Sequence, residues 1–522
     1  MKRFLAMLKQ EFRGYNAKAL TGDLLAGVTV AAVALPLALA FGVSSGADAA
    51  AGLITAIIAG LVIGALSGGY YQISGPTGAM AAILMSLSAQ YGMSGIFIAT
   101  FLAGCMLLIA GVFKLGKLTS FIPMPVVTGF TSGIAVIIAL GQVDNLFGVT
   151  SVGHTTVEKL LSYGSLGFPV NFAAVALGVL VMVIMLLWPK KWNGIVPGSL
   201  VGIIVATIVS VIVKPDVAVV GAIPQTLLPD SRLTFDMINM ETLPELISPA
   251  VSIAILGMIE SLLCGASAGR MTGVRLDANQ ELIAQGVGNV VLPFVGGIPA
   301  TAAIARTSVA IKSGARTRLT GIVHALALLV FMLVLAPIMS LIPLSALAGV
   351  LIITAWRMNE FHAIKYIFSH KLKSAIVMFL ATMVATILFD LTIAILIGVG
   401  IAVICMLGRL SKLMITFDGN DDNKTVRICG PMLFASATQV EDLAESLKTA
   451  KSVTFDMRAV SDIDVSGAQA FTTLHDALLS GGTEITVSGL SDQAKTMFTR
   501  CGLVELFGKE HITDDLEAHL SK

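Results

Sequence analysis

The chain has 522 residues, of which 56% are hydrophobic and 12% are charged, and its formal net charge is +1. Soluble globular chains carry about 25% charged residues, so this composition excludes a wholly soluble protein. The near-neutral balance gives no reason to expect a nucleic-acid partner. Residues 24–409 are nearly all apolar, whereas residues 410–522 have an ordinary soluble composition. We therefore expect a polytopic membrane domain over residues 23–411 and a separate water-exposed domain over residues 412–522.

The N-terminal stretch MKRFLAMLKQEFRGYNAKAL interleaves lysine and arginine with large apolar residues. It lacks the long apolar core and the small-residue cleavage site of a signal peptide. We expect residues 1–22 to form an amphipathic helix at the cytoplasmic membrane surface. The five cysteines form no CxxC pair, so no metal site, cofactor or disulfide framework is expected.

The membrane domain contains fourteen apolar segments. Three of them, near 77–91, 280–292 and 300–311, are too short to cross ~30 Å of hydrocarbon as ordinary helices. The longer ones lie near 24–43, 50–66, 95–113, 121–141, 170–188, 196–213, 249–268, 319–340, 343–356, 373–389 and 391–408. With the N-terminus inside, the loops after even-numbered segments carry most of the lysine and arginine, as the positive-inside rule requires. The sequence thus predicts fourteen transmembrane segments with both termini in the cytoplasm.

Two parts of this domain resemble each other. GVTVAAVALPLALAFGVSSG (27–46) matches AVSIAILGMIESLLCGASAG (250–269) at an offset of 223 residues, and the same offset places Pro76 of SGPTGAM on Pro299 of GIPATAA. An odd number of segments, seven, separates the copies, so they run in opposite directions. The sequence therefore predicts 7+7 inverted repeats, with segments 1–4 and 8–11 forming a core and the others a gate.

Each proline turn follows a run expected to be extended, YYQIS or VLPFVGG, and precedes a short helix. Extended chain at membrane depth is tolerated only where it is buried in protein or lines a cavity. The first amides of a helix have no intrahelical partner and carry the positive end of the dipole, so two such ends facing each other would bind an anion. The alternative is that each proline merely kinks a bent helix. The expected donors are Thr77, Gly78 and Ala79 on one helix, and Ala302, Ala303 and Ile304 on a helix that starts at Ala300.

Two ionisable residues fall within the apolar segments, where charges are expensive and usually functional. Glu260 is the only carboxylate in the eighth segment, and Arg306 lies about two turns into the short helix after Pro299. They either pair with each other as a structural ion pair, or Arg306 attracts the anion while Glu260 exchanges protons. His324 is expected to be a packed polar residue and Asp390 a helix cap.

From residue 425 the pattern alternates between strands and helices, which predicts a small α/β layer domain. DIDVSGAQAF places Ser466 at a strand-to-helix turn, where Asp464 is a candidate N-cap. The expected elements are a strand in TVRICGPMLF, a helix over 436–450, a strand over 452–457, a helix over 466–480, a strand over 484–489 and a helix over 491–500.

Over essentially its whole length, the chain resembles a bacterial member of the sulfate permease (SulP) family of anion transporters. The resemblance rests on SGPTGAM, GMIESLL and GGIPATAAIARTSVAIKSGARTRLTGIVHA, and on VRICGPMLF and DIDVSGA of a terminal STAS domain. It implies inverted repeats, a core that moves against a gate, usually a dimer, and substrate between the third and tenth helix ends. It also implies that Ser466 corresponds to a serine phosphorylated in anti-sigma-factor antagonists, as an alternative to a structural role in the capped helix turn.

The sequence departs from the family's sodium-coupled bicarbonate members, which carry Asp and a hydroxyl residue in the eighth helix. Here those positions hold Glu260 and Cys264, and Ile304 supplies no hydroxyl. Sodium coordination needs several oxygen ligands, as for other hard cations. We therefore expect coupling to protons through Glu260.

Together these features predict secondary active transport of a small oxyanion (sulfate, bicarbonate or C4-dicarboxylate) by proton-coupled symport. We expect the transport to use an elevator-type mechanism and the protein to lie in the bacterial inner membrane. The expected partners are the anion, protons, the lipid bilayer, a second copy in a homodimer and a cytoplasmic protein bound by the STAS domain. Three alternatives remain open: an uncoupled channel or exchanger, a nucleobase permease with a similar membrane fold, and a receptor that signals through the STAS domain. An enzyme is not expected, because the sequence shows no nucleophile–base pair or metal cluster.

Overall fold

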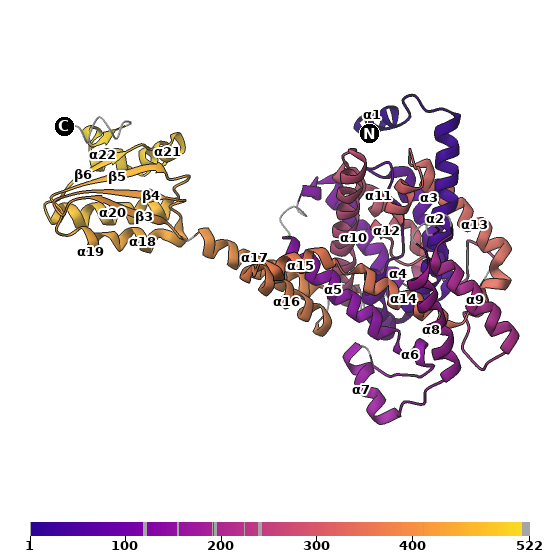
Figure 1. The fold of residues 1–522 in the computed structure, drawn as a ribbon. Coiled ribbons are helices and arrows are strands. Elements are labelled where there is room, and N and C mark those ends of the chain that lie inside the picture. The colour runs from indigo at the N-terminus through magenta and orange to yellow at the C-terminus, as the bar shows by residue number, and fades with distance from the viewer. Residues whose placement is uncertain are drawn as a thin grey trace. The chain divides into compact units, whose positions relative to one another are not determined.

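The structure is a computed structural model that describes residues 2–117, 123–153, 156–189, 192, 196–223, 225–237, 243–389, 391–410 and 412–513. Asp390, the expected helix cap, lies outside these residues. The chain divides into two compact units, residues 1–399 and 400–522, whose elements are labelled in Figure 1. This division falls inside the last apolar helix, whereas the predicted domain boundary follows that helix at residue 411.

The first unit is helical. Its first half contains α1 (Lys2–Glu11), α2 (Ala17–Ser44), α3 (Ala49–Leu66), α4 (Gly78–Val112), α5 (Met124–Gly141), α6 (Val143–Phe147), α7 (Thr156–Leu166), α8 (Phe172–Leu187) and α9 (Gly198–Val213). Its second half contains η2 (Phe235–Met237), α10 (Leu243–Thr272), α11 (Ala278–Val291), η3 (Leu292–Val295), α12 (Ile304–Lys312), α13 (Leu319–Met339), α14 (Leu344–Met358), α15 (Phe361–Ser369), α16 (Lys373–Leu388) and α17 (Leu391–Leu410).

Every predicted apolar segment coincides with a helix. Helix α4 carries two of them, because Gly92 interrupts it with φ 63° and ψ −162°, a conformation open to glycine. Among the described residues, six helices are long and apolar enough to cross a membrane, and four more are apolar but shorter. The number of spans therefore stays a prediction.

The helix contacts follow the predicted inverted repeat. The repeat pairs each segment with the one seven places away in the chain. The contact between α4 and α11 therefore corresponds to the contact between α13 and α3, and the contact between α4 and α10 corresponds to that between α13 and α2. In the same way, the contact between α5 and α16 corresponds to that between α14 and α8. The first two correspondences lie within the predicted core and the third lies within the predicted gate, as two interlocked repeats require.

The two proline turns meet in a short antiparallel pair of strands, β1 (Ser74–Gly75) and β2 (Thr301–Ala302). Ser74 lies opposite Ala302 and Gly75 opposite Thr301. The segments containing Pro76 and Pro299 are thus neighbours although 223 residues separate them in the sequence. The expected meeting of the two turns is confirmed.

Two local expectations are wrong. The run VLPFVGG is not extended, because α11 continues to Val291 and passes into η3, whose first turn accepts the proline without losing a hydrogen bond. Extended chain begins only after Gly296, which has φ 74°. The following helix, α12, starts at Ile304 rather than at Ala300, because the backbone before it pairs with strand β1 and with neighbouring side chains.

The second unit is an α/β domain with one five-stranded sheet in the order β3-β4-β5-β6-β7. Strands β3 and β4 are antiparallel and the remaining pairs are parallel. The expected helix over 436–450 is two short helices, and the sequence did not predict β3, β7 or α22. The elements are β3 (Met414–Gly419), β4 (Asn423–Cys429), η4 (Phe434–Ser436), α18 (Ala437–Glu441), α19 (Leu443–Leu447), β5 (Ser452–Ala459), α20 (Val465–Ser480), β6 (Glu484–Ser488), α21 (Asp492–Arg500), α22 (Leu503–Phe507), η5 (Lys509–His511) and β7 (Ile512–Thr513).

A buried carboxylate on the central strand β5 accepts hydrogen bonds from two arginines. The side chain of Asp456 is 1% exposed and accepts bonds from Arg458 Nε and Arg427 Nε, both at 2.9 Å. The bonds from Arg458 are the main cause that lowers the pKa of Asp456 to about 2. Because the pKa is depressed by folding, the stabilisation is present above the unfolded-state pKa of about 3.9 and is lost as pH falls towards the folded value.

We expect Asp456→Asn to lower the unfolding free energy of fragment 412–522 by about 1–2 kcal/mol at pH 7, since the two arginines are partly exposed and screened. The difference from the parent should shrink between about pH 4 and pH 2. Urea titrations at several pH values measure it, with Asp421→Asn, an exposed loop aspartate, as the control. A difference that is constant with pH would contradict this assignment.

Candidate anion-binding site

The N-terminus of α4 is capped and held by one threonine. Thr77 has extended backbone angles, and its Oγ1 accepts the Met80 amide at 3.4 Å. The same hydroxyl donates to Glu260 Oε2 on α10 at 2.9 Å. The amides of Gly78 and Ala79, the first two residues of the helix, have no acceptor among the described residues. The α4 end therefore presents unpaired donors beside a carboxyl group.

The N-terminus of α12 is more open. Ala303 is its N-cap and makes no side-chain capping bond. Ile304 is 44% exposed, and the amides of Ile304 and Ala305 have no acceptor within the described part of the chain. The amides of Ala302 and Ala303, which we expected to be free donors, already have acceptors. The Ala302 amide donates to Ser261 Oγ at 3.3 Å, and the Ala303 amide donates to the Ile73 carbonyl at 3.0 Å. The later helix start moves the unpaired donors onwards along the chain.

Arg306 joins the two helix ends. It lies in the first turn of α12 rather than two turns into it, and it is 2% exposed. Its Nη2 donates to the Pro76 carbonyl at 2.7 Å, whereas its Nη1 has no hydrogen-bond partner among the described residues. A Cβ atom on Gly75 would lie 2.5 Å from that Nη1, so a side chain there would displace the Arg306 guanidinium from its present position. Arg306 and Glu260 form no ion pair within 4.0 Å among the described residues, although the two groups are close enough to interact electrostatically.

Polar side chains on α11 and α3 hold the extended chain before α12. Asn289 Oδ1 accepts the Ala300 amide at 2.8 Å, and its Nδ2 donates to the Ala300 carbonyl at 2.9 Å. Thr55 Oγ1 accepts the Ile298 amide at 2.7 Å. These bonds replace the strand or helix partners that this backbone lacks.

The chain before α4 is held in the same way. Glu281 is fully buried, and its Oε2 accepts from Ser67 Oγ at 2.6 Å and from the Gly68 amide at 3.0 Å. Gln285 Nε2 donates to Glu281 Oε1 at 2.8 Å and to Ser74 Oγ at 3.0 Å. Sequence reasoning missed Glu281, Gln285 and Asn289, although their i, i+4, i+8 spacing in an apolar helix is a signal for one polar face.

Three side-chain positions of the candidate site, Cys264, Ala302 and Ile304, supply no oxygen. Cys264 Sγ donates to Thr307 Oγ1 at 3.2 Å, so this position contributes sulfur where an alkali cation prefers oxygen. The described residues contain no group of three His, Cys, Asp or Glu side chains that could hold a metal.

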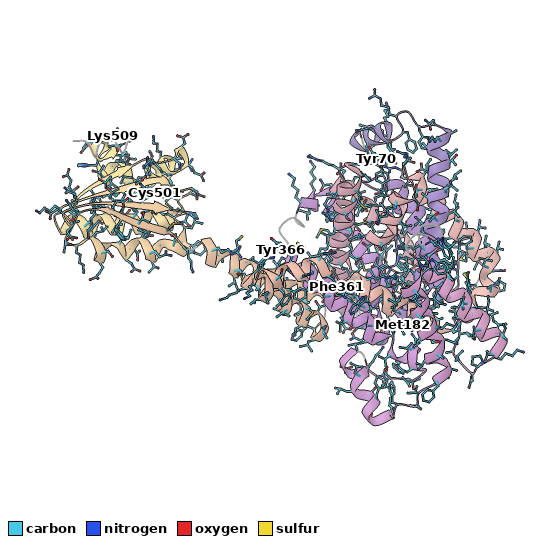
Figure 2. The ribbon with its side chains drawn as sticks, viewed as in Figure 1. Tyr70, Met182, Phe361, Tyr366, Cys501 and Lys509 are labelled. Atoms are coloured by element: carbon cyan, nitrogen blue, oxygen red, sulfur yellow. The ribbon has the colours of Figure 1, made fainter. Side chains whose placement is uncertain are left out.

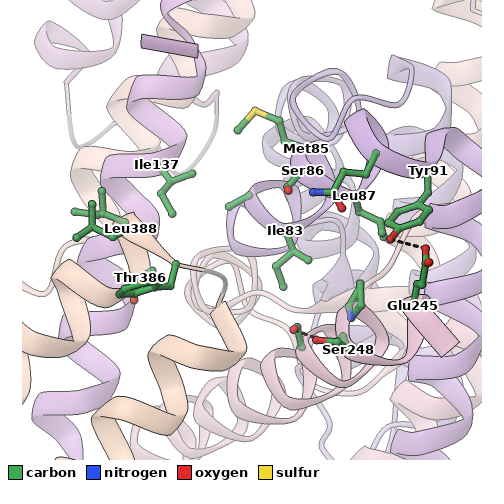
Figure 3. A pocket seen from close by; sticks show the side chains of 16 residues that line it. Ile83, Met85, Ser86, Leu87, Tyr91, Ile137, Glu245, Ser248, Thr386 and Leu388 are labelled. Carbon is green, nitrogen blue, oxygen red and sulfur yellow. Dashed lines mark hydrogen bonds between the residues drawn. The ribbon is translucent and has the colours of Figure 1, made fainter. Parts of the chain in front are cut away.

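A cavity of about 400 Å³ lies further along α4. Figure 3 shows Ile137, Thr386 and Leu388 on one side and Ile83, Met85 and Leu87 on the other, with Tyr91 donating to Glu245 at 3.0 Å near the rim. The cavity does not reach the α4 end. A Cβ atom on Gly78 would lie 2.5 Å from Ile138 Cδ1, so α5 covers that end. This cavity and the unpaired donors are therefore separate features.

Ser466 and His324 are two further residues that the sequence singled out. Ser466 is the second residue of α20, and Asp464 caps that helix by accepting the Gly467 amide at 2.8 Å. This geometry agrees with the structural explanation of DIDVSGA. His324 is fully buried, and neither ring nitrogen has a hydrogen-bond partner among the described residues.

The sequence matches known families over almost its entire length. The Sulfate permease family profile covers residues 20–382, and the STAS domain profile covers residues 414–519. YvdB of Bacillus subtilis (strain 168), which carries the provisional description of a sulfate transporter, is 35% identical over 96% of this chain and 98% of its own. The bicarbonate transporter BicA of Synechocystis sp. (strain PCC 6803) is 30% identical over 95% of this chain and 93% of its own.

Solved structures share the fold. The transmembrane domain of a cyanobacterium bicarbonate transporter BicA matches with a TM-score of 0.67 and 31% identity, over 73% of this chain and 98% of that one. The murine anion transporter Slc26a9 in the inward-facing state matches with a TM-score of 0.88 over 99% of this chain and 94% of that one, and its 17% identity supports a likeness of fold alone. The expected polytopic helical fold with a C-terminal STAS domain is confirmed, and the chain belongs to the Sulfate permease family of anion transporters.

Proposed function

We propose that this chain carries out secondary active transport of a small oxyanion, which binds between the N-termini of α4 and α12. The observation that carries the proposal is the convergence of the two helix ends at the β1–β2 pair, with unpaired amides on both. Helix N-termini bind anions because their free amides and the helix dipole both favour negative charge. Arg306 adds a fixed positive charge and an Nη1 with no partner among the described residues. The predicted residues Thr77, Gly78, Ala79, Ile304 and Arg306 remain in the proposed site, while Ala305 replaces Ala302 and Ala303.

The proposed substrates are sulfate, bicarbonate and C4-dicarboxylates. The relatives named above are described as sulfate or bicarbonate transporters. Backbone amides and one guanidinium recognise oxygen atoms and charge rather than a particular carbon skeleton. The same donors argue against a neutral nucleobase, which needs matched side-chain donors and acceptors.

The position of Glu260 supports the proposal that it couples anion transport to protons. The carboxyl is bonded to Thr77, the residue that caps α4, and no cation pairs with it in the described structure. An anion on the neighbouring amides adds negative charge, which favours the protonated form of an acid. Proton and anion would then bind together. An uncoupled channel or exchanger would use the same amides without needing Glu260.

An elevator-type movement is consistent with the division of the helices. Helices α4 and α12 belong to the core, whereas Ile138 on α5 of the gate covers Gly78. Sliding of the core past the gate would uncover the α4 end and open a path to the cavity beside Ile137. We further propose a bacterial inner-membrane location with cytoplasmic termini, a homodimer, and a STAS domain that binds a cytoplasmic protein.

We expect Arg306→Ala to raise KM for anion uptake by about tenfold or more, since hydrogen bonds to charged groups contribute about 1.5–3 kcal/mol. The measurement is initial uptake of labelled sulfate, bicarbonate and fumarate by proteoliposomes. Lys312→Ala, which removes an exposed charge from the last turn of α12, is the control. Because Arg306 does not pair with Glu260, a double variant should not recover the loss. Recovery would show a structural ion pair instead.

We expect Glu260→Gln to retain anion exchange and to lose accumulation driven by an inward proton gradient, because the amide mimics the protonated acid. Uptake with and without a pH gradient, in the presence and absence of sodium, measures both properties. Glu441→Gln, which changes an exposed glutamate of α18 outside the membrane unit, should behave like the parent. Proton-driven accumulation that survives in Glu260→Gln, or a strict sodium requirement in the parent, would refute the coupling mechanism.

A further inference from the structure

The N-terminal helix α1 is tied to the membrane unit by a buried ion pair. The side chain of Glu11 is fully buried, and its Oε2 lies 2.7 Å from Arg318 Nη2 and accepts from Arg318 Nε at 2.8 Å. Its Oε1 accepts the Arg318 amide at 2.6 Å. Glu11 thus binds both the side chain and the backbone of the residue that precedes α13. Phe4 of the same helix packs its ring 5.3 Å from the Arg318 guanidinium.

From Arg318 a continuous chain of bonds leads to the α4 half of the proposed site. Arg318 Nη1 donates to the Ala65 carbonyl at 2.7 Å and to the Ser67 carbonyl at 3.3 Å, at the C-terminal end of α3. Ser67 in turn donates to Glu281. Through Gln285 that carboxylate reaches Ser74 of strand β1, three residues before the cap of α4.

A second set of bonds leads to the α12 half. Asp23 on α2 is fully buried and accepts the amides of Arg316 at 2.6 Å and Thr317 at 3.1 Å. The hydroxyls of Thr317 and Thr320 donate to it at 2.7 and 2.8 Å, and so does Tyr15 from the α1–α2 turn at 2.8 Å. Residues 313–318 form the turn that ends α12, so its position depends on these carboxylates.

We propose that α1 is a clamp on the anion site, in which Glu11 acts as a positioning residue that holds both helix ends through Arg318. The proposal rests on the proposed function, which places the anion between α4 and α12. Glu11 touches neither helix end. Its loss would leave Arg318 buried without its anionic partner, which is costly, and would loosen the segments that present the amides. Because preorganised donors bind more tightly than mobile ones, the affinity for the anion should fall.

Ionisable groups from other parts of the membrane unit lie around Glu11. Tyr70, which lies near α1 in Figure 2, and Tyr71 are close enough to interact electrostatically with Glu11. Asp23 is the nearby like charge and Arg318 the opposite one.

The test compares the full-length parent with Glu11→Gln, Arg318→Gln, the double variant and Gln10→Ala, an exposed neighbour on α1. Uptake of sulfate, bicarbonate and fumarate by proteoliposomes gives KM and kcat, and hydrogen–deuterium exchange follows peptides over 65–75 and 304–318. We expect Glu11→Gln to raise KM by about two- to thirtyfold, the range of long-distance couplings, with kcat little changed. The double variant should equal Arg318→Gln alone, because both changes break one chain of contacts. Exchange should rise in both peptides, and Gln10→Ala should match the parent.

The possible results distinguish a failure of the proposal for α1 from a failure of the proposed transport function. If the parent takes up none of the three anions, the proposed function fails, while faster exchange in both peptides of Glu11→Gln would still support the clamp. If the parent transports and Glu11→Gln changes neither KM nor exchange, the clamp is wrong. A lower melting temperature of Glu11→Gln with unchanged KM would assign α1 a role in stability alone and would also overturn the proposal.

Discussion

Backbone amides and carbonyls that leave a helix inside a membrane-embedded domain must find partners, because each unsatisfied group there costs several kcal/mol. This constraint explains the centre of the molecule. Strands β1 and β2 satisfy part of each other's backbone, and Asn289 and Thr55 satisfy the chain that follows Gly297. The groups left over are the first amides of α4 and α12, and these are the groups that the proposed anion would bind.

The same constraint explains where small residues are required. A Cβ atom at Gly75 or Gly78 would lie 2.5 Å from Arg306 Nη1 or from Ile138 Cδ1, so a larger residue would displace these side chains. The proposed site therefore consists of backbone, one arginine and one carboxyl group. In our proposals its geometry depends on the more distant residues Glu281, Asp23 and Glu11, each of which is buried against polar donors.

The sequence predicted the helical architecture well, because two proline turns at a constant offset in the chain report on an internal repeat that spans most of the membrane unit. It located the α4 end correctly from SGPTGAM. The sequence analysis placed the start of α12 too early, because the amides of Ala302 and Ala303 donate to Ser261 and Ile73, which are distant in the sequence. For the same reason it could not decide between two partners for Arg306, which turned out to bind the Pro76 carbonyl. The i, i+4, i+8 polar face of α11 was readable and was overlooked.

The central claim, that an oxyanion binds between the ends of α4 and α12, is tested most directly by the structure of the full-length protein with selenate, a heavier analogue of sulfate. The account predicts one anomalous-scattering peak within hydrogen-bonding distance of the amides of Gly78 and Ile304 and close to Arg306. A peak in the cavity lined by Ile83 and Phe389, with none at the helix ends, would contradict it.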